Sequence, residues 1–324
     1  MGTPEFACPS LGALIKRQLI VGVVTQPDRP VGRGRRILPS PVKRLAEKHH
    51  IPVYQPQRVK NPSFLDEVTT IQPNLVVVVA FGQILPASFL AIPRICSINL
   101  HPSLLPRYRG PAPIPWAIIK GDKETGLAVQ KIQTGVDEGE ILLQKKIPIK
   151  LTDTAKDLEK KLAVAGAVLL EEAVRRIKEG RATFLEQDKK KASYAPKITK
   201  DQAEVDWRRS CLEIHNLIRG LNPHPGAFTL ATVRAKMLEM KIWRTELLNR
   251  DSEEPEKVCP GTVVKIEKEK GFWVRGGDGD LLIREVQLPN RNSISSYDFI
   301  KGYSLKKGDV LGTRVGIFSR CSFS

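Results

Sequence analysis

Four consecutive valines, at positions 76–79, constrain the fold of this chain more than any other stretch. A continuous run of β-branched residues is typical of a parallel strand that is covered on both faces of its sheet. Apolar runs at 19–24 and 95–100 predict two further strands. The segments 40–50 and 62–71 are predicted helices, and the first opens with a Ser-Pro pair typical of a helix start. This alternation predicts an α/β fold with a Rossmann-like parallel sheet.

The residues after 206 have a different pattern, in which short strands dominate. Five such strands are predicted, at 228–233, 241–247, 262–267, 271–275 and 281–287. Short strands at this spacing, with a Gly-Gly-Asp-Gly turn among them, are typical of a small antiparallel barrel. We therefore predict three regions, namely an α/β domain at 1–191, a linker at 192–206 and an OB-like β-barrel at 207–324.

The chain of 324 residues is strongly basic, with a formal charge of +17 from 52 Lys and Arg against 35 Asp and Glu. The charge is uneven, because residues 1–60 hold eleven basic and three acidic side chains and so a balance of +8. A field of this sign favours a polyanionic partner, nucleic acid first of all. A basic solvated surface without such a partner is the alternative that composition leaves open.

Nothing in the composition indicates a membrane, secretion or a metal. No apolar run approaches the ~18 residues that span a bilayer, and the first residues lack the basic head and apolar core of a signal peptide. The five cysteines are scattered and include no Cys-x-x-Cys pair, which fits neither a disulfide framework nor a zinc site. We expect a cytoplasmic protein with no metal and no membrane partner.

Two polar residues, Asn99 and His101, stand at the end of the predicted strand 95–100. Because they are two positions apart, their side chains point to one face while Leu100 points into the packing. Ligands usually bind at this end of the strands in an open α/β sheet. An amide can hold a developing oxyanion and an imidazole can move a proton, so the pair suits acyl transfer. A polar cap at a strand end is the alternative interpretation.

An acidic residue, Asp137, stands between Gly135 and Gly139 in the short connection of two predicted strands, 126–132 and 140–149. At the tip of a tight loop its carboxylate could face back toward the sheet end. There it could pair with the imidazole of His101 and fix its tautomer. An exposed hairpin acid is the alternative.

A basic segment at 25–36 combines four arginines with two glycines and two prolines and has no apolar periodicity. We predict a loop throughout this segment. Arginine suits phosphate because the guanidinium group can bind it with two parallel hydrogen bonds. The segment therefore predicts contact with a nucleic-acid backbone.

These motifs together resemble the methionyl-tRNA formyltransferase family, one of the folate-dependent formyltransferases. The resemblance extends over nearly the whole chain. It is carried by Gly2-Thr3-Pro4-Glu5-Phe6, Thr25-Gln26-Pro27-Asp28-Arg29-Pro30, Gly32-Arg33-Gly34, Pro39-Ser40-Pro41-Val42-Lys43, Asn99-Leu100-His101, Ser103-Leu104-Leu105-Pro106, Gly135-Val136-Asp137-Glu138-Gly139, Tyr194-Ala195-Pro196-Lys197, Asp206-Trp207 and Arg219-Gly220-Leu221-Asn222-Pro223.

The resemblance implies transfer of a formyl group from 10-formyltetrahydrofolate, as co-substrate, to the amino group of initiator methionyl-tRNA. It implies that Asn99 holds the oxyanion, that His101 assists proton transfer, and that Asp137 positions and polarises His101. It also implies that the C-terminal barrel binds tRNA and that no metal takes part. We expect a monomer, although no sequence feature bears on the oligomeric state.

The resemblance further implies two groups of binding residues. The implied folate contacts are Ser103, Leu104, Leu105, Pro106, Phe81, Gly82, Ile84 and Leu85. The implied tRNA contacts are Arg29, Arg33, Arg35, Arg36 and Lys43.

The chain departs from the family pattern in two places. Pro102 follows the histidine where glycine is common, and proline has no backbone N–H to offer a ligand. The family's first strand is expected before Gly2 and is missing here. Because a strand is typically ~5–6 residues long, we expect a start that lies about eight residues short of the family pattern, through truncation or a misassigned start. Two alternative functions stay open: a formyltransferase that acts on another amine, and a truncated, inactive relative that binds tRNA or another RNA.

Overall fold

The computed structural model describes residues 1–31, 36–247 and 258–312. The chain forms two compact units. Unit 1 comprises Met1–Ile114, Glu124–Pro148 and Asp157–Pro196. Unit 2 comprises Pro115–Lys123, Ile149–Lys156 and the described residues after Pro196. Local sequence patterns did not indicate that two short internal segments would group with the C-terminal part.

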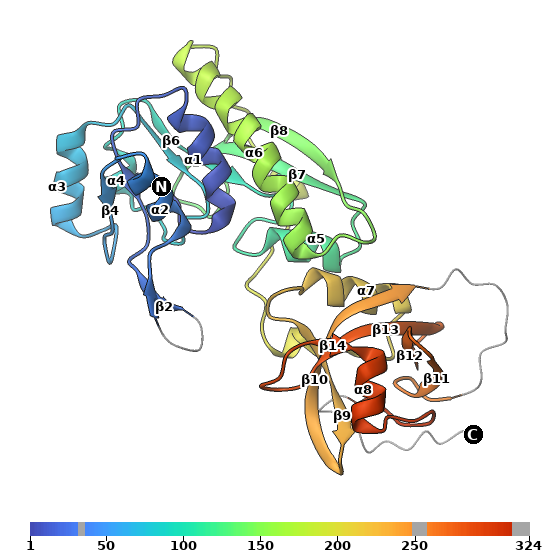
Figure 1. Cartoon of the computed structure of the whole chain (residues 1–324). Coiled ribbons are helices and arrows are strands. Elements are labelled where there is room, and N and C mark those ends of the chain that lie inside the picture. Colours follow the sequence, from blue (N-terminus) through green and yellow to red (C-terminus); the bar gives the residue numbers. More distant parts are fainter. Residues whose placement is uncertain (32–35, 248–257, 313–324) are drawn as a thin grey trace. The chain divides into compact units, whose positions relative to one another are not determined.

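Besides a separate two-stranded hairpin, unit 1 is built on short strands in two sheets (Figure 1). These are β1 (Val23–Val24) with β4 (Val53–Tyr54), and β5 (Leu75–Val78), β6 (Cys96–His101), β7 (Glu124–Lys131) and β8 (Ile141–Pro148) in that order. The pairs β1–β4 and β5–β6 are parallel, which confirms an α/β fold with parallel strands. The prediction of a parallel sheet holds only in part, because β7 is antiparallel to β6, and β7 and β8 are antiparallel to each other. Their connection is too short for the crossover that parallel strands require.

The first two residues lie between the two sheets of unit 1. Gly2 forms a parallel bridge with Val79, and its N–H donates to the carbonyl oxygen of Val24 at 3.0 Å. The N–H of Val79 donates to the carbonyl oxygen of Met1 at 2.9 Å. Met1 and Gly2 therefore connect β1 to β5 by backbone hydrogen bonds.

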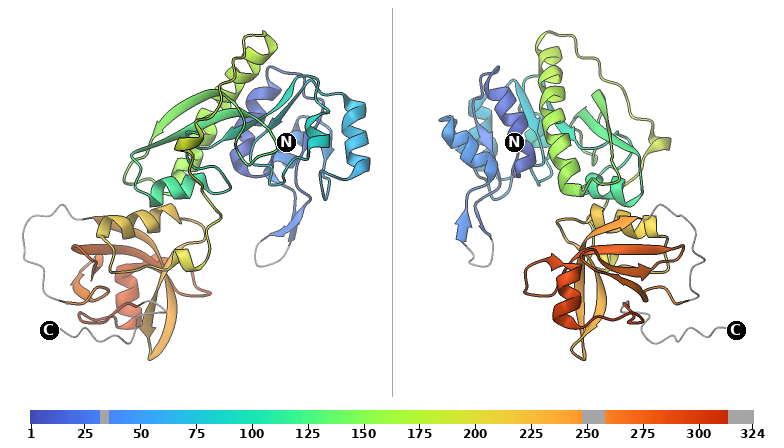
Figure 2. Two further views of the ribbon diagram at one scale, coloured as in Figure 1. Left: turned by 180° about the vertical axis from the view of Figure 1, so that it is seen from behind. Right: turned by 45° about the vertical axis from the view of Figure 1, so that its right-hand side comes forward.

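The helices of unit 1 include the two that the sequence predicted, at 40–50 and 62–71. The helices of this unit are η1 (Glu5–Ala7), α1 (Cys8–Ile15), α2 (Pro41–Lys48), α3 (Pro62–Ile71), α4 (Ala87–Leu90), α6 (Ala155–Lys178) and η2 (Lys189–Lys191). Ser40 caps α2 as predicted, since its Oγ accepts the N–H of Lys43 at 3.0 Å. Helix α6 lies against β6, because a Cβ on Gly166 would come within 2.7 Å of Leu100 Cδ2. Figure 2 shows α6 beside the strands of unit 1 in two further views.

Unit 2 is mostly antiparallel β-structure. It contains α5 (Pro113–Ile119), η3 (Asp201–Ala203), α7 (Cys211–Gly220), β9 (Ala227–Val233), β10 (Lys236–Leu247), β11 (Val263–Glu267), β12 (Gly271–Arg275), β13 (Asp280–Gln287), β14 (Ile294–Ser295) and α8 (Ser296–Tyr303). The sheet order is β11-β12-β13-β10-β9, with β14 beside β13, and every neighbouring pair is antiparallel. The predicted antiparallel domain is thereby confirmed, whereas its closure into a barrel stays a prediction.

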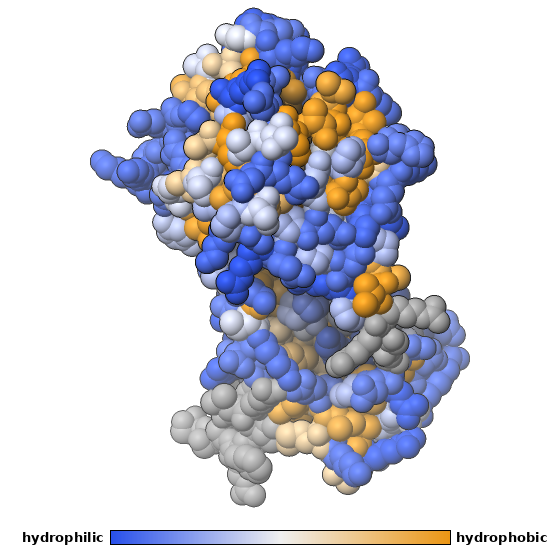
Figure 3. Space-filling view, turned by 90° about the vertical axis from the view of Figure 1, so that its left-hand side faces the viewer, coloured by the Kyte–Doolittle hydropathy of each residue, from blue (hydrophilic) through white to orange (hydrophobic). Residues whose placement is uncertain are grey.

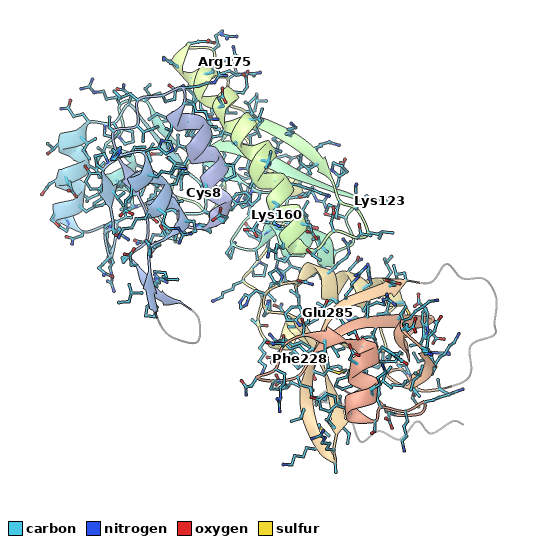
Figure 4. The ribbon with its side chains drawn as sticks, in the orientation of Figure 1. Cys8, Lys123, Lys160, Arg175, Phe228 and Glu285 are labelled. Carbon is cyan, nitrogen blue, oxygen red and sulfur yellow. The ribbon has the colours of Figure 1, made fainter. Side chains whose placement is uncertain are left out.

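On the face drawn in Figure 3, hydrophilic residues predominate and apolar ones gather in patches. Basic side chains occur along α6, where Lys160 and Arg175 are labelled in Figure 4.

In the part of the chain that the structure describes, no helix is long and apolar enough to cross a membrane. Among the described cysteines, Cys8, Cys96 and Cys211 are free thiols.

Helix α7 holds the segment Ile149–Lys156 in unit 2. Arg219 Nη1 donates to the carbonyl oxygens of Lys150 at 3.1 Å and Asp153 at 3.0 Å. His215 Nε2 donates to the carbonyl oxygen of Leu151 at 3.1 Å, and its Nδ1 lies 2.8 Å from Thr245 Oγ1. The motif that begins at Arg219 therefore has a structural role in this unit.

Stability should depend on pH through His215. Burial lowers its pKa below the usual 6.5, and the charge of Arg219 acts in the same direction. The unfolded chain then binds the proton more tightly, so the contribution of His215 is complete above about pH 6.5 and is lost as the pH falls. We expect His215→Gln to flatten the decline in the free energy of unfolding between about pH 7 and pH 5, measured by urea denaturation. The exposed His224→Gln variant should keep the wild-type slope; equal slopes in both variants would contradict the assignment.

Candidate active site

Strand β6 presents Asn99 and His101 on one face, as its alternation predicted. Asn99 pairs with Val78 of β5 and Gln130 of β7, and His101 pairs with Ala128 of β7. His101 is buried and Asn99 is half-buried. The two side chains therefore lie at the carboxyl end of an interior strand whose opposite face packs on α6.

The loop between β7 and β8 brings Asp137 to this pair. We call residues 133–140 the Asp137 loop. Asp137 Oδ1 lies 3.5 Å from His101 Nδ1 and 3.5 Å from Asn99 Nδ2. The structure thus brings the three predicted residues together, although their chemical roles stay proposals.

The second ring nitrogen of His101 determines which atom can exchange a proton. Nε2 lies 2.9 Å from the carbonyl oxygen of Tyr108. Because a carbonyl oxygen only accepts, this contact assigns a hydrogen to Nε2. Nδ1, which faces Asp137, is therefore the ring atom at which a proton can be gained or lost.

Two further groups hold the carboxylate of Asp137. The N–H of Gly110 donates to Oδ2 at 2.9 Å, and Gln130 Nε2 donates to Oδ1 at 2.8 Å. Sequence reasoning missed both groups. The signal for Gln130 was a polar residue within the apolar run of a buried strand, where its side chain is 2% exposed. Gly110 contributes only its backbone and left no such signal.

The predicted folate segment directly follows β6. Ser103 Oγ donates to the carbonyl oxygen of Arg107 at 2.6 Å, and Gln144 Nε2 donates to that of Leu105 at 2.7 Å. Ser103 and Leu105 are buried, whereas Leu104 and Pro106 are half-buried. These contacts fix the loop beside His101, and folate contact by its residues stays a prediction.

The second predicted folate segment divides between core and surface. Phe81 and Leu85 are buried in the cluster that includes Phe64 and Phe89. Gly82 and Ile84 are exposed, and Ile84 is 81% accessible. Folate contact by these four residues stays a prediction.

Part of the predicted basic loop is a hairpin. Strands β2 (Arg29–Val31) and β3 (Arg36–Leu38) pair antiparallel, with Arg29 opposite Leu38. A loop over the whole segment was therefore wrong, because backbone pairing across a glycine-rich connection needs no apolar periodicity. Figures 1 and 2 show the hairpin projecting from unit 1. Arg33 and Arg35 lie outside the described residues, as does the side chain of Arg36.

The base of this hairpin is tied to α2 and β4. Lys43 Nζ donates to Asp28 Oδ2 at 2.7 Å and to Gln55 Oε1 at 2.8 Å. Gln55 Nε2 donates to Asp28 Oδ1 at 2.7 Å, and these contacts, with Lys43 first, lower the pKa of Asp28. Arg29 Nη2 donates to Gln26 Oε1 at 3.1 Å. Lys43, predicted to contact tRNA, is thus engaged within the protein.

Comparisons with known proteins agree with this geometry. A family model described as "Formyl transferase" matches residues 1–174, and one described as "Formyl transferase, C-terminal domain" matches 197–304. The methionyl-tRNA formyltransferase of Geobacter sulfurreducens is 41% identical over 313 residues, which cover 96% of this chain and 95% of that protein. The methionyl-tRNA formyltransferase of Clostridioides difficile is 42% identical and covers 96% and 98%.

The chain belongs to the methionyl-tRNA formyltransferase family. The family resemblance inferred from the motifs is thereby confirmed. A solved N-formyltransferase from Helicobacter canadensis, in complex with folinic acid and dTDP-3-aminofucose, shares the fold with a TM-score of 0.64. At 22% identity it covers 87% of this chain and 96% of its own.

The methionyl-tRNA formyltransferase fold here offers no evident metal centre. Within residues 1–31, 36–247 and 258–312, no group of three or more His, Cys, Asp or Glu side chains is arranged to hold a metal ion. What the site does offer is an amide, an imidazole and a carboxylate within hydrogen-bonding reach of one another. These groups can stabilise an oxyanion and move a proton.

Proposed function

We propose that this chain transfers the formyl group of 10-formyltetrahydrofolate to the amino group of initiator methionyl-tRNA at Asn99, His101 and Asp137. The observation that carries the proposal is the convergence of these side chains at the end of β6, within a member of the family. Acyl transfer to an amine requires an oxyanion donor and a proton acceptor, and the site contains both.

The reaction follows from the atoms available. The amine attacks the formyl carbon, a new C–N bond forms, and the carbonyl oxygen becomes an oxyanion. Asn99 Nδ2 carries two hydrogens, of which the contact to Asp137 uses at most one, so it can donate to that oxyanion. His101 Nδ1, facing Asp137, takes the proton that the amine releases. The intermediate then collapses, and the tetrahydrofolate nitrogen leaves as it accepts a proton.

The hairpin β2–β3 is proposed to contact the tRNA backbone. Its arginines, Arg29, Arg33, Arg35 and Arg36, suit phosphate through their guanidinium groups. The β-rich unit 2 is proposed to bind the remainder of the tRNA. Lys43 supports this function by anchoring the hairpin through Asp28 rather than by direct contact with phosphate.

Substitutions at the hairpin base should separate anchoring from contact. If Lys43 anchors the hairpin, Lys43→Met and Asp28→Asn should both weaken tRNA affinity, by roughly tenfold, with little change in kcat. If Lys43 instead binds phosphate, Asp28→Asn frees it and leaves the affinity equal or higher. Lys48→Met removes the same charge from the exposed end of α2 and should have a smaller effect. Filter binding over a range of salt concentrations measures all three.

The decisive assay for the function is formyl transfer from 10-formyltetrahydrofolate to charged initiator tRNA. Glycinamide ribonucleotide and an amino-sugar nucleotide serve as competing acceptors. We expect transfer to methionyl-tRNA to dominate. Preferred transfer to either small amine would establish a different formyl acceptor. Binding of tRNA without any transfer would replace the proposal by the RNA-binding alternative.

A further inference from the structure

A glutamine far along the chain contacts the Asp137 loop. Gln187 Nε2 donates to the carbonyl oxygen of Asp137 at 2.9 Å and to that of Gly139 at 2.7 Å. Its segment is aligned by Leu185, which exchanges two backbone hydrogen bonds with Ile141, at 2.8 and 2.9 Å. Gln187 therefore binds the loop at the backbone of the residue that faces His101.

A buried arginine fixes the orientation of the Gln187 amide. Arg109 Nε and Nη2 donate to Gln187 Oε1 at 3.1 and 2.9 Å. A guanidinium only donates and a backbone carbonyl only accepts, so the amide oxygen must face Arg109 and the nitrogen must face the loop. Arg109 is 3% exposed, and its Nη1 also lies 3.1 Å from Glu138 Oε1 in the same loop.

The backbone of Arg109, like its side chain, forms hydrogen bonds with neighbouring segments. Its N–H donates to the carbonyl oxygen of Ser193 at 2.8 Å, and its carbonyl oxygen accepts from Ala195 at 2.7 Å. The next residue, Gly110, donates to the carboxylate of Asp137. The segments around residues 109, 137 and 187 are thus joined in one hydrogen-bond network.

This hydrogen-bond network can affect catalysis because the Asp137 loop has a constrained conformation. Asp137 has a φ of 54°, in the left-handed region that residues with a side chain adopt at a cost. Its Oδ1 must nevertheless stay near both His101 Nδ1 and Asn99 Nδ2. A displacement of ~1 Å at a reacting group can cost ~10²-fold in rate. A group that fixes the backbone of Asp137 can therefore control turnover without touching substrate.

We propose that Gln187, oriented by Arg109, is a positioning residue that acts through the backbone of Asp137 to hold its carboxylate against His101 and Asn99. The inference rests on the proposed function of that site. A role in structure alone, as a partner that keeps buried Arg109 paired, is the competing explanation.

Two substitutions of Gln187 distinguish these roles. Gln187→Ala removes the contacts of Nε2 with the loop carbonyl oxygens and with Gln130 Oε1, at 3.2 Å, as well as the hydrogen bonds from Arg109. Gln187→Glu keeps the size and the contact with Arg109, but it places an acceptor against the carbonyl oxygens of Asp137 and Gly139. We expect both variants to lose ~10–100-fold in kcat, with KM values for folate and tRNA within about twofold of wild type. Gln133→Glu, which adds the same charge at an exposed position of the same loop, should retain wild-type kcat.

A double-mutant cycle with Asp137→Asn completes the test. If Gln187 acts through Asp137, adding Gln187→Glu or Gln187→Ala to Asp137→Asn should lower kcat by no more than about twofold further. The inference would be overturned if the kcat loss of the double variant equalled the product of the losses of the two single variants. A wild-type kcat for either Gln187 variant, or a change in KM alone, would also overturn it. Melting curves identify any variant that does not fold, in which case the size-preserving Glu variant decides.

The cycle also separates this inference from the function on which it rests. A wild-type enzyme without formyl transfer to methionyl-tRNA, or an Asp137→Asn variant with wild-type kcat, refutes the proposed function or site. Normal Gln187 variants in an enzyme that Asp137→Asn impairs refute only the positioning role.

Discussion

Replacement of His101 by alanine is expected to lower kcat by ~10²–10⁴-fold, because the site loses the group that accepts the amine proton. The affinity for tRNA should stay nearly unchanged, since the buried imidazole contacts the Asp137 loop and Tyr108. Single-turnover formylation measures the chemical step, and filter binding measures the affinity. The two together test the catalytic assignment.

The alanine variant also removes the hydrogen bond between His101 Nε2 and the carbonyl oxygen of Tyr108, so a second variant is needed. His101→Gln keeps a donor close to the position of Nε2 but cannot carry a proton between nitrogen atoms. We expect it to lose as much kcat as His101→Ala. Recovery of activity in the glutamine variant would mean that His101 only positions the segment around Tyr108. A matching loss of tRNA affinity would likewise contradict the catalytic role.

Substitution of Gly139 by alanine should have the second largest effect, about a 10²-fold loss of kcat. A Cβ at this position would lie 1.7 Å from the carbonyl oxygen of Lys131. This contact joins backbone to Cβ, so no side-chain rotation can relieve it. The Asp137 loop must therefore move, and with it the carboxylate that faces His101. Initial rates at saturating substrates measure the loss.

Gly135 offers a matched control on the other side of the same loop. A Cβ there would lie 2.5 Å from Glu138 Oε2, the end of a flexible side chain that can turn away. Turning it disturbs the ion pair of Glu138 with Arg109, in which the carboxylate is 45% exposed. We expect Gly135→Ala to retain kcat within a few-fold. If the two variants lost kcat equally, the loss in Gly139→Ala could not be assigned to displacement of the Asp137 loop.

Local sequence patterns were sufficient wherever a short segment determines its own structure. Helix α3 spans the residues that the sequence predicted, 62–71, and Ser40 caps α2. The alternation of β6 places Asn99 and His101 on one face because the side-chain period of a strand is two. The parallel pairing of β5 with β6 follows from their runs of apolar residues.

The antiparallel direction of β7 and β8 and the β2–β3 hairpin became evident only in the structure. Local composition describes the surroundings of each residue but not the partner of its backbone. Lys43 illustrates the same limit, because a basic residue in a basic segment predicts phosphate contact. Only the fold shows Asp28 and Gln55 at its ammonium group.

The sequence by itself determined the family, helices α2 and α3, strands β5 and β6, and the identity of the catalytic candidates Asn99, His101 and Asp137. The tertiary structure alone decided how Asp137 is held, through Gln187 and Arg109. Gln187 donates to a residue 50 positions away and accepts from one 78 positions away. Side-chain periodicity is set by near neighbours, whereas such hydrogen bonds exist only after distant segments pack together.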